Sequence, residues 1–172
     1  MTREEALKLS QEWKVDTEYL LEENGCFPMT LHMPIDFIDK CKELINRDET
    51  PFEILMMNAQ YALLLKLDIE NVIPEDEFNV KNAKAMVTHW KNVSKYKDDN
   101  NLIPVQIPTD PDEVRIVASL FKAYRQLENK DLSIEDLYLE YLKAYLETDL
   151  EALKASQEEV YEELDEDFKK QF

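Results

Sequence analysis

Apolar side chains recur every three or four residues along most of this chain, which is the spacing of one face of an α-helix. Several of these stretches follow a hydroxyl or acidic residue with a glutamate three positions later, a pattern that resembles a capping box and marks a helix start. Such starts occur at Thr2 to Glu5, Thr50 to Glu53, Asp110 to Glu113 and Thr148 to Glu151. Together these signals predict seven helices, over residues 3–24, 34–47, 51–67, 80–97, 111–128, 134–147 and 149–170.

The predicted helix over residues 51–67 differs from the others because apolar side chains lie nearly all round it. A helix without a polar face is expected at the centre of a fold. Two segments interrupt the helical pattern. Residues 26–33 contain Pro28 and are predicted to be extended, as a turn or one short strand. Residues 98–109 contain two prolines and are predicted to be a loop with extended backbone.

These elements predict an all-α fold, an irregular bundle of about six to seven helices with at most one short strand pair. A length of 172 residues suits one sizeable core. We therefore expect a single helical domain over residues 1–172, from which the acidic helix 149–170 can protrude. The single glycine, Gly25, is expected to end the first helix. Rossmann fingerprints, P-loops and nucleophile elbows need several glycines and are excluded.

Cysteine usage and hydropathy indicate the compartment. The only two cysteines, Cys26 and Cys41, form neither a CxxC pair nor a disulfide framework. The N-terminus lacks the apolar stretch behind a basic region that a signal peptide has. No run of apolar residues approaches the ~20 that a membrane-spanning helix requires. These observations predict a cytoplasmic protein with reduced thiols and no membrane association.

Candidate catalytic chemistry is sparse. Neither His32 nor His89 has an acid three residues before it, so zinc and di-iron helix motifs are not expected. Two Glu-x-x-Glu pairs within residues 159–166 resemble the magnesium-binding carboxylate rows of all-helical nucleotide pyrophosphohydrolases. Those enzymes need a second matched pair on a facing helix, and none is recognisable here. We therefore expect no catalytic, metal-binding or cofactor-binding residue.

The charge of the chain is strongly negative and unevenly distributed. The net charge is −18, and residues 131–172 carry fourteen acidic against four basic residues, a net of −10. Acid-rich helical surfaces can copy the phosphate spacing of DNA and so occupy a basic nucleic-acid-binding groove. The sequence therefore predicts a partner-binding surface formed by the acids near the C-terminus: Glu158, Glu159, Glu162, Glu163, Asp165, Glu166 and Asp167.

The predicted helix over residues 80–97 is the basic exception, because residues 81–97 contain five lysines and no acid. Its lysines can pair loosely with acidic neighbours, for about 0–1 kcal/mol per exposed pair. Alternatively, they contact a phosphate or base, or an acidic partner such as the C-terminal helix of a second copy. The candidate basic contact face consists of Lys84, Lys91, Lys95 and Trp90.

The charge pattern favours a non-enzymatic, acidic, helical protein-binding module. In its most specific form it is an inhibitor that occupies the basic, nucleic-acid-binding surface of a partner protein. Direct binding to nucleic acid is not expected, because that requires a cationic surface. Two alternatives remain: an assembly chaperone or adaptor that forms a homodimer, and an all-α, magnesium-dependent nucleotide hydrolase.

Overall fold

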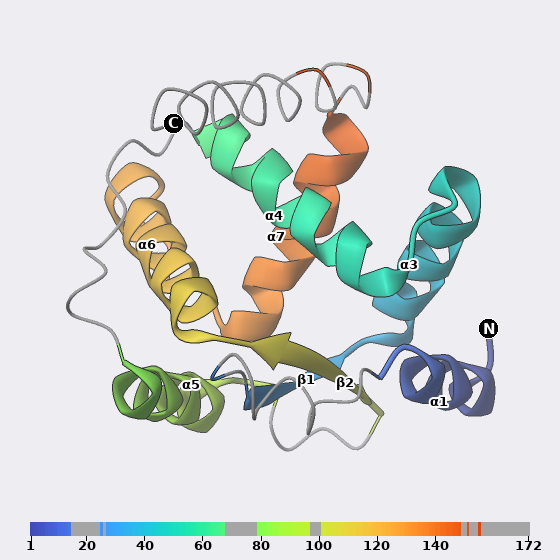
Figure 1. The fold of residues 1–172 in the computed structure, drawn as a ribbon, viewed down its shortest axis with the longest axis horizontal. Helices are drawn as coiled ribbons and strands as arrows, with labels where there is room; N and C mark the ends of the chain where they lie inside the picture. Colours follow the sequence, from blue (N-terminus) through green and yellow to red (C-terminus); the bar gives the residue numbers. More distant parts are fainter. Residues whose placement is uncertain are drawn as a thin grey trace, which may run out of the picture.

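Six helices and two strands make up the part of the chain that the computed structural model describes, residues 1–14, 25, 27–67, 79–96, 101–148, 151 and 155. Figure 1 shows their arrangement, with the two strands between the helices. The elements, in chain order, are α1 (Arg3–Glu12), β1 (Phe27–Met33), α3 (Ile35–Asp48), α4 (Phe52–Leu67), α5 (Val80–Val93), β2 (Ile103–Thr109), α6 (Pro111–Leu127) and α7 (Ile134–Glu147).

The strands β1 and β2 pair antiparallel over their full lengths, from Phe27 opposite Thr109 to Met33 opposite Ile103. Alternate residues on each strand are buried, so the sheet has one core face. Pro28, Pro104 and Pro108 all lie at the alternating positions between the buried ones. A proline cannot donate to a ladder, and a two-stranded sheet tolerates it where the backbone nitrogen faces away from the partner strand.

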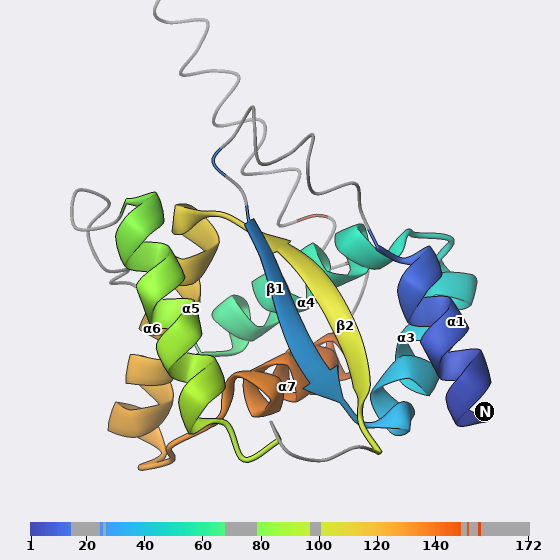
Figure 2. The same cartoon turned by 90° about the horizontal axis from the view of Figure 1, so that it is seen from below.

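Helices cover both the core face and the sides of this sheet. α4 and α7 cross each other on one side of the sheet, and together they supply many of the buried side chains (Figure 1). In the view from below, α5 and α6 lie beside β1, whereas α1 and α3 lie beside β2 (Figure 2). The core therefore lies between the sheet, α4 and α7, with the other helices closing it laterally.

The prediction of a mostly helical fold with at most one strand pair is confirmed. The prediction of a loop over residues 98–109 is wrong, because residues 103–109 form β2. Its partner strand lies seventy or more residues earlier, and local sequence patterns do not report such a pairing. No described helix is long and apolar enough to cross a membrane.

Two predicted helices end earlier than expected. α1 ends at Glu12 rather than at residue 24, and residues 15–24 lie outside the described part. α5 ends at Val93 rather than at residue 97. Gly25 has the positive φ of 65° that glycine adopts readily. The predicted helix 149–170 lies outside the described residues, except for Glu151 and Ala155.

α4 is only partly central, although its sequence predicts a helix at the centre of the fold. Leu55, Ala59 and Leu63 are fully buried. In contrast, Ile54 is 40%, Met57 60% and Leu65 46% exposed. One apolar stripe of α4 is thus open to solvent, because the sheet and α7 cover only the opposite side.

Candidate functional site

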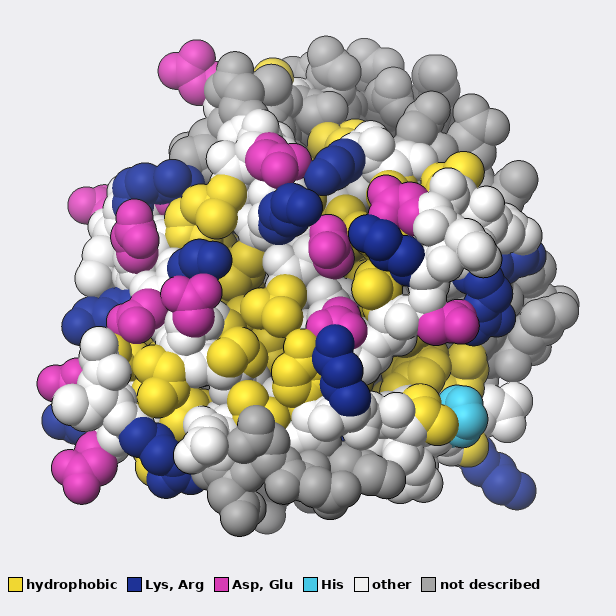
Figure 3. All heavy atoms as spheres, turned by 180° about the vertical axis from the view of Figure 1, so that it is seen from behind, with side chains coloured by type: hydrophobic (Ala, Val, Ile, Leu, Met, Phe, Trp, Pro, Cys, Tyr) yellow, Lys and Arg dark blue, Asp and Glu magenta, His cyan; other side chains and the backbone are white. Residues whose placement is uncertain are grey.

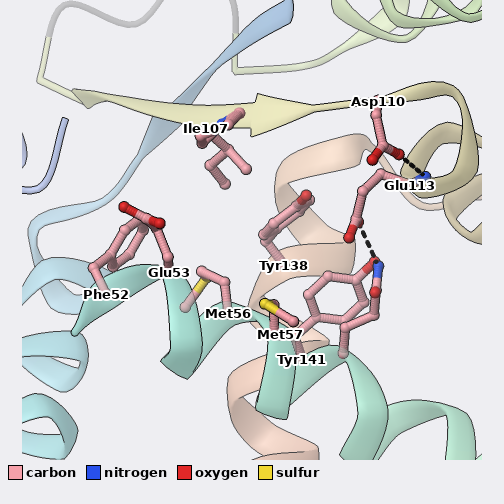
Figure 4. A pocket seen from close by; sticks show the side chains of 11 residues that line it. Phe52, Glu53, Met56, Met57, Ile107, Asp110, Glu113, Tyr138 and Tyr141 are labelled. Atoms are coloured by element: carbon pink, nitrogen blue, oxygen red, sulfur yellow. Dashed lines mark hydrogen bonds between the residues drawn. The ribbon is translucent and has the colours of Figure 1, made fainter. Parts of the chain in front are cut away.

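A pocket of about 180 Å³ lies where α4, α7, the end of β2 and the start of α6 meet (Figure 4). Its lining combines apolar side chains with carboxylates and phenols, and among its lining residues none is Lys, Arg or His. The apolar part consists of Phe52, Met56, Met57, Ile107 and Pro108. The polar part consists of Glu53, Gln60, Asp110, Glu113, Tyr138 and Tyr141.

The first turn of α6 supplies two of these carboxylates. Asp110 is the N-cap, and its Oδ1 accepts a 2.8 Å hydrogen bond from the backbone N–H of Glu113. Pro111 occupies the first helical position, where the missing N–H is not needed. The sequence predicts that Glu113 returns to the cap in a capping box. Instead, its Oε2 accepts a 3.1 Å hydrogen bond from Nε2 of Gln60 on α4.

A similar departure places Glu53 in the pocket. The sequence predicts a capping box between Thr50 and Glu53, but the buried Oγ1 of Thr50 has no hydrogen-bond partner in the described structure. Glu53 is exposed and lines the pocket. Both acids that the sequence assigns to capping boxes beside a proline therefore face this pocket rather than their own caps.

Burial raises the pKa of Glu113 above its usual value. The hydrogen bond from Gln60 opposes this by favouring the ionised form, whereas the negative charges of Asp110 and Asp112 raise the pKa further. The carboxyl group consequently holds its proton more tightly than an exposed glutamate does. A positive charge placed in the pocket would offset the repulsion from Asp110 and Asp112 and so favour the ionised form of Glu113.

The two tyrosines of α7 form the floor of the pocket. Their rings contact each other at a centroid distance of 4.7 Å. The hydroxyl of Tyr141 accepts a 3.2 Å hydrogen bond from Nε2 of Gln60. Tyr138 is only 3% exposed, its pKa is raised well above the usual value by burial, and its hydroxyl has no hydrogen bond in the described structure. Figure 4 shows this hydroxyl pointing into the space below Ile107, beside Glu113.

The pocket is chemically suited to a positively charged group with an apolar stem. Three carboxylates and a phenol hydroxyl provide acceptors, and the methionines and Phe52 provide an apolar wall. Among the described residues, no group of three or more His, Cys, Asp or Glu side chains is arranged to hold a metal ion. Three acids line this pocket, and the two Glu-x-x-Glu pairs of the hydrolase alternative lie outside the described residues, so that alternative stays a prediction.

The residues of the predicted basic contact face have separate surroundings. Lys95 pairs with Asp136 at 3.2 Å, and Nζ of Lys84 lies 5.8 Å from the ring centroid of Phe27. Lys91 is partly buried. Trp90 contacts Phe121 at a ring-centroid distance of 5.2 Å and lines a second hollow of about 320 Å³, which the three lysines do not line. The interpretation as one contact face stays a prediction.

The predicted acidic surface lies outside the described residues. This applies to all seven of its members, from Glu158 to Asp167. On the face shown in Figure 3, acidic and basic side chains of the described part are intermixed around apolar areas. That face therefore carries no continuous acidic ridge among its described residues.

None of the pocket residues is recognisable as a site from the sequence alone. Gln60 is one of four polar residues in the mostly apolar helix 51–67 and the only one of them that is buried, which was the available signal for a buried polar contact. Tyr138 has the spacing of a core residue, so its unpaired hydroxyl could not be anticipated. Fold and pocket define a mostly helical protein with one antiparallel strand pair and an acidic, apolar-walled pocket. Comparison with protein-family models, curated proteins and solved structures found no match for this chain.

Proposed function

We propose that this protein is a non-enzymatic, acidic protein-binding module that occupies a basic surface of a partner protein, in competition with nucleic acid. The pocket carries the proposal, because three carboxylates share it with apolar walls and no basic residue is among its lining residues. Such a site complements a basic side chain better than a neutral one.

The charge of the whole chain supports the same function. With a net charge of −18, long-range attraction accelerates encounters with a basic partner, and salt weakens this attraction. The acids of residues 158–167 are the proposed main contact surface, where they compete with DNA phosphates for the partner's basic groove. Partner and inhibitor would meet in the cytoplasm.

Affinity capture with the full chain tests this function. Immobilised protein is incubated with an extract of its native cells, and bound proteins are identified before and after addition of duplex DNA. The expected result is a nucleic-acid-binding protein that DNA or high salt displaces. The control is a variant in which the seven acids of residues 158–167 are replaced by their amides. A partner that survives high salt and is unaffected by DNA would contradict the proposal.

The exposed apolar stripe of α4 favours a second candidate, an adaptor that forms a homodimer. Ile54, Met57 and Leu65 are each at least 40% exposed on one helix. Contiguous exposed apolar side chains often mark a protein–protein interface. In this alternative a second copy covers the stripe.

A further inference from the structure

Acidic residues around the pocket have an explanation that requires no ligand. Asp110, Asp112 and Glu113 occupy the cap and first turn of α6, where negative charge interacts favourably with the helix dipole. Carboxylates at a helix N-terminus therefore do not by themselves define a binding site. A second observation is needed, and Tyr138 provides it.

The hydroxyl of Tyr138 is an unpaired polar group in an almost completely buried side chain. Only 3% of Tyr138 is exposed, and no hydrogen bond satisfies its hydroxyl in the described structure. The fully buried side-chain atoms without a partner do not include this oxygen, so the hydroxyl is open to the pocket while its ring is buried. Because Tyr138 lines the pocket and its ring closes off the other sides, a hydrogen-bond partner of this hydroxyl reaches it from that cavity.

We infer that the pocket binds the guanidinium group of an arginine side chain presented by the basic partner protein. This inference rests on the proposed function and names the chemical group that the partner supplies. Asp110 and Glu113 lie on one wall, and the hydroxyl of Tyr138 points towards the same space (Figure 4). Glu53 adds a third carboxylate from α4.

The distribution of acceptors favours arginine over lysine. Asp110 and Glu113 each use one oxygen in a hydrogen bond and keep the other for a ligand. A guanidinium presents five N–H donors in a fixed plane and can reach several separated acceptors at once. An ammonium is a compact, strongly hydrated charge that loses more hydration in a pocket of this kind.

The apolar walls suit the rest of an arginine side chain. Its methylene groups can pack against Met56 and Met57, whose flexible thioethers adapt to the shape of a ligand. The ring of Phe52 stacks on Trp13 at a centroid distance of 4.8 Å and is only 4% exposed, so it adds a small apolar surface to this wall. An apolar ligand would satisfy these walls but would leave the carboxylates and Tyr138 without partners.

Methionine-methyl NMR on the full chain tests the inference directly. The chain has six methionines, of which Met56 and Met57 line the pocket and the other four are internal controls. The probes are the capped tripeptides acetyl-Ala-Arg-Ala-amide, acetyl-Ala-Lys-Ala-amide and acetyl-Ala-Gln-Ala-amide, at matched ionic strength. We expect saturable shifts confined to Met56 and Met57, with arginine binding at least about threefold more tightly than lysine. The glutamine peptide should give no saturable shift.

Two substitutions assign the contacts. Tyr138→Phe should weaken binding of the arginine peptide by about three- to tenfold, because one hydrogen bond is lost. Since Tyr138 is buried, folding of this variant is checked by circular dichroism. Glu53→Gln changes an exposed side chain and should also weaken binding, whereas Glu43→Gln on α3, outside the pocket lining, should not.

Several results would overturn the inference. These are absence of saturation at Met56 and Met57, equal binding of all three peptides, or equal shifts at all six methyls. The inference would also be overturned if both Tyr138→Phe and Glu53→Gln kept the affinity of the native chain for the arginine peptide. In that case water alone satisfies the hydroxyl of Tyr138. The assay contains no partner protein, so its failure would leave the proposed function to the capture experiment. Conversely, failed capture would not alter a positive peptide titration.

Discussion

The side-chain amide of Gln60 donates a 3.1 Å hydrogen bond to the carboxylate of Glu113 and so connects α4 to α6 across 53 residues of sequence. The same Nε2 donates to the hydroxyl of Tyr141 on α7, so three helices meet at one amide group. Glu113 nevertheless remains at a position where burial and two neighbouring acids disfavour its charge. One neutral donor does not offset these effects.

This relationship predicts a pH-dependent difference between the native chain and Glu113→Gln. The pKa of Glu113 is raised in the folded state above the usual 4.5, so the folded protein binds this proton more tightly than the unfolded chain. Its contribution to stability is complete below the unfolded pKa and is lost as the pH rises through the folded pKa. Glu113→Gln removes this loss. We therefore expect its stability relative to the native chain to increase over that pH window, measured by urea unfolding at successive pH values.

Asp136 supplies the control with the opposite sign. Burial acts to raise its pKa, but hydrogen bonds from Tyr96, Ser133 and Lys95 outweigh burial and lower it below 3.8. Its stabilising contribution is present above the unfolded pKa and is lost as the pH falls through the folded pKa. Asp136→Asn should therefore be less stable than the native chain near neutral pH, with a difference that shrinks in acid. If the stability differences of Glu113→Gln and Asp136→Asn from the native chain changed with pH in the same way, both assignments would be contradicted.

A second prediction concerns the contact between α7 and the end of α3. The hydroxyl of Tyr145 donates a 2.7 Å hydrogen bond to Oδ2 of Asp48, whose two oxygens also accept from Arg47 at 2.8 and 3.0 Å. Tyr145→Phe should lower the free energy of unfolding by about 1–2 kcal/mol, because a bond to a charged acceptor is lost while Arg47 still neutralises the carboxylate. Tyr61 on α4 makes no hydrogen bond in the described structure. Tyr61→Phe should thus change stability by less than about 0.5 kcal/mol.

Local features of the fold were predictable from the sequence, and long-range ones were not. The capping box of Thr2 and Glu5 forms as predicted because all of its partners lie within one helical turn. The acids at Glu53 and Glu113 fit the same local pattern but line the pocket, and Glu113 bonds to Gln60 instead of its own cap. The hydrogen-bond partner of Glu113 depends on how α4 packs against α6, and a local helix-start pattern carries no information about that packing.

The strand pair shows the same limit. Alternation within residues 27–33 and 103–109 is visible in the sequence, but His32, Gln106 and the three prolines make each segment also readable as a loop. Only the pairing of the two segments with each other determines that they are strands and not loops. The pocket could not be predicted from the sequence for two reasons. Its walls come from four elements that are distant in the sequence, and its unpaired hydroxyl is defined by the absence of a contact.

A third prediction follows from the backbone at the end of α3. Glu49 has φ 51° and ψ 40°, the left-handed conformation, which is unfavourable for residues with a β-carbon by about 1–2 kcal/mol. Glu49→Gly should therefore raise the free energy of unfolding by about 1 kcal/mol, less the cost of a more flexible unfolded chain. Glu43→Gly, in the interior of the same helix, should lower it by about 1 kcal/mol. Urea unfolding of both variants checks the pair, and a decrease for Glu49→Gly would refute the argument from strain.

The last prediction tests whether the exposed stripe of α4 is an interface between two copies. Ile54 and Leu65 are 40% and 46% exposed, so the double variant Ile54→Lys, Leu65→Lys should change stability by only about 1 kcal/mol or less. Leu63 is fully buried on the same helix, and Leu63→Ala should cost about 2–5 kcal/mol. In the adaptor alternative, light scattering coupled to size exclusion gives a dimer for the native chain and a monomer for the lysine variant. A native monomer at micromolar concentration would reject that alternative and leave the stripe available to a different protein.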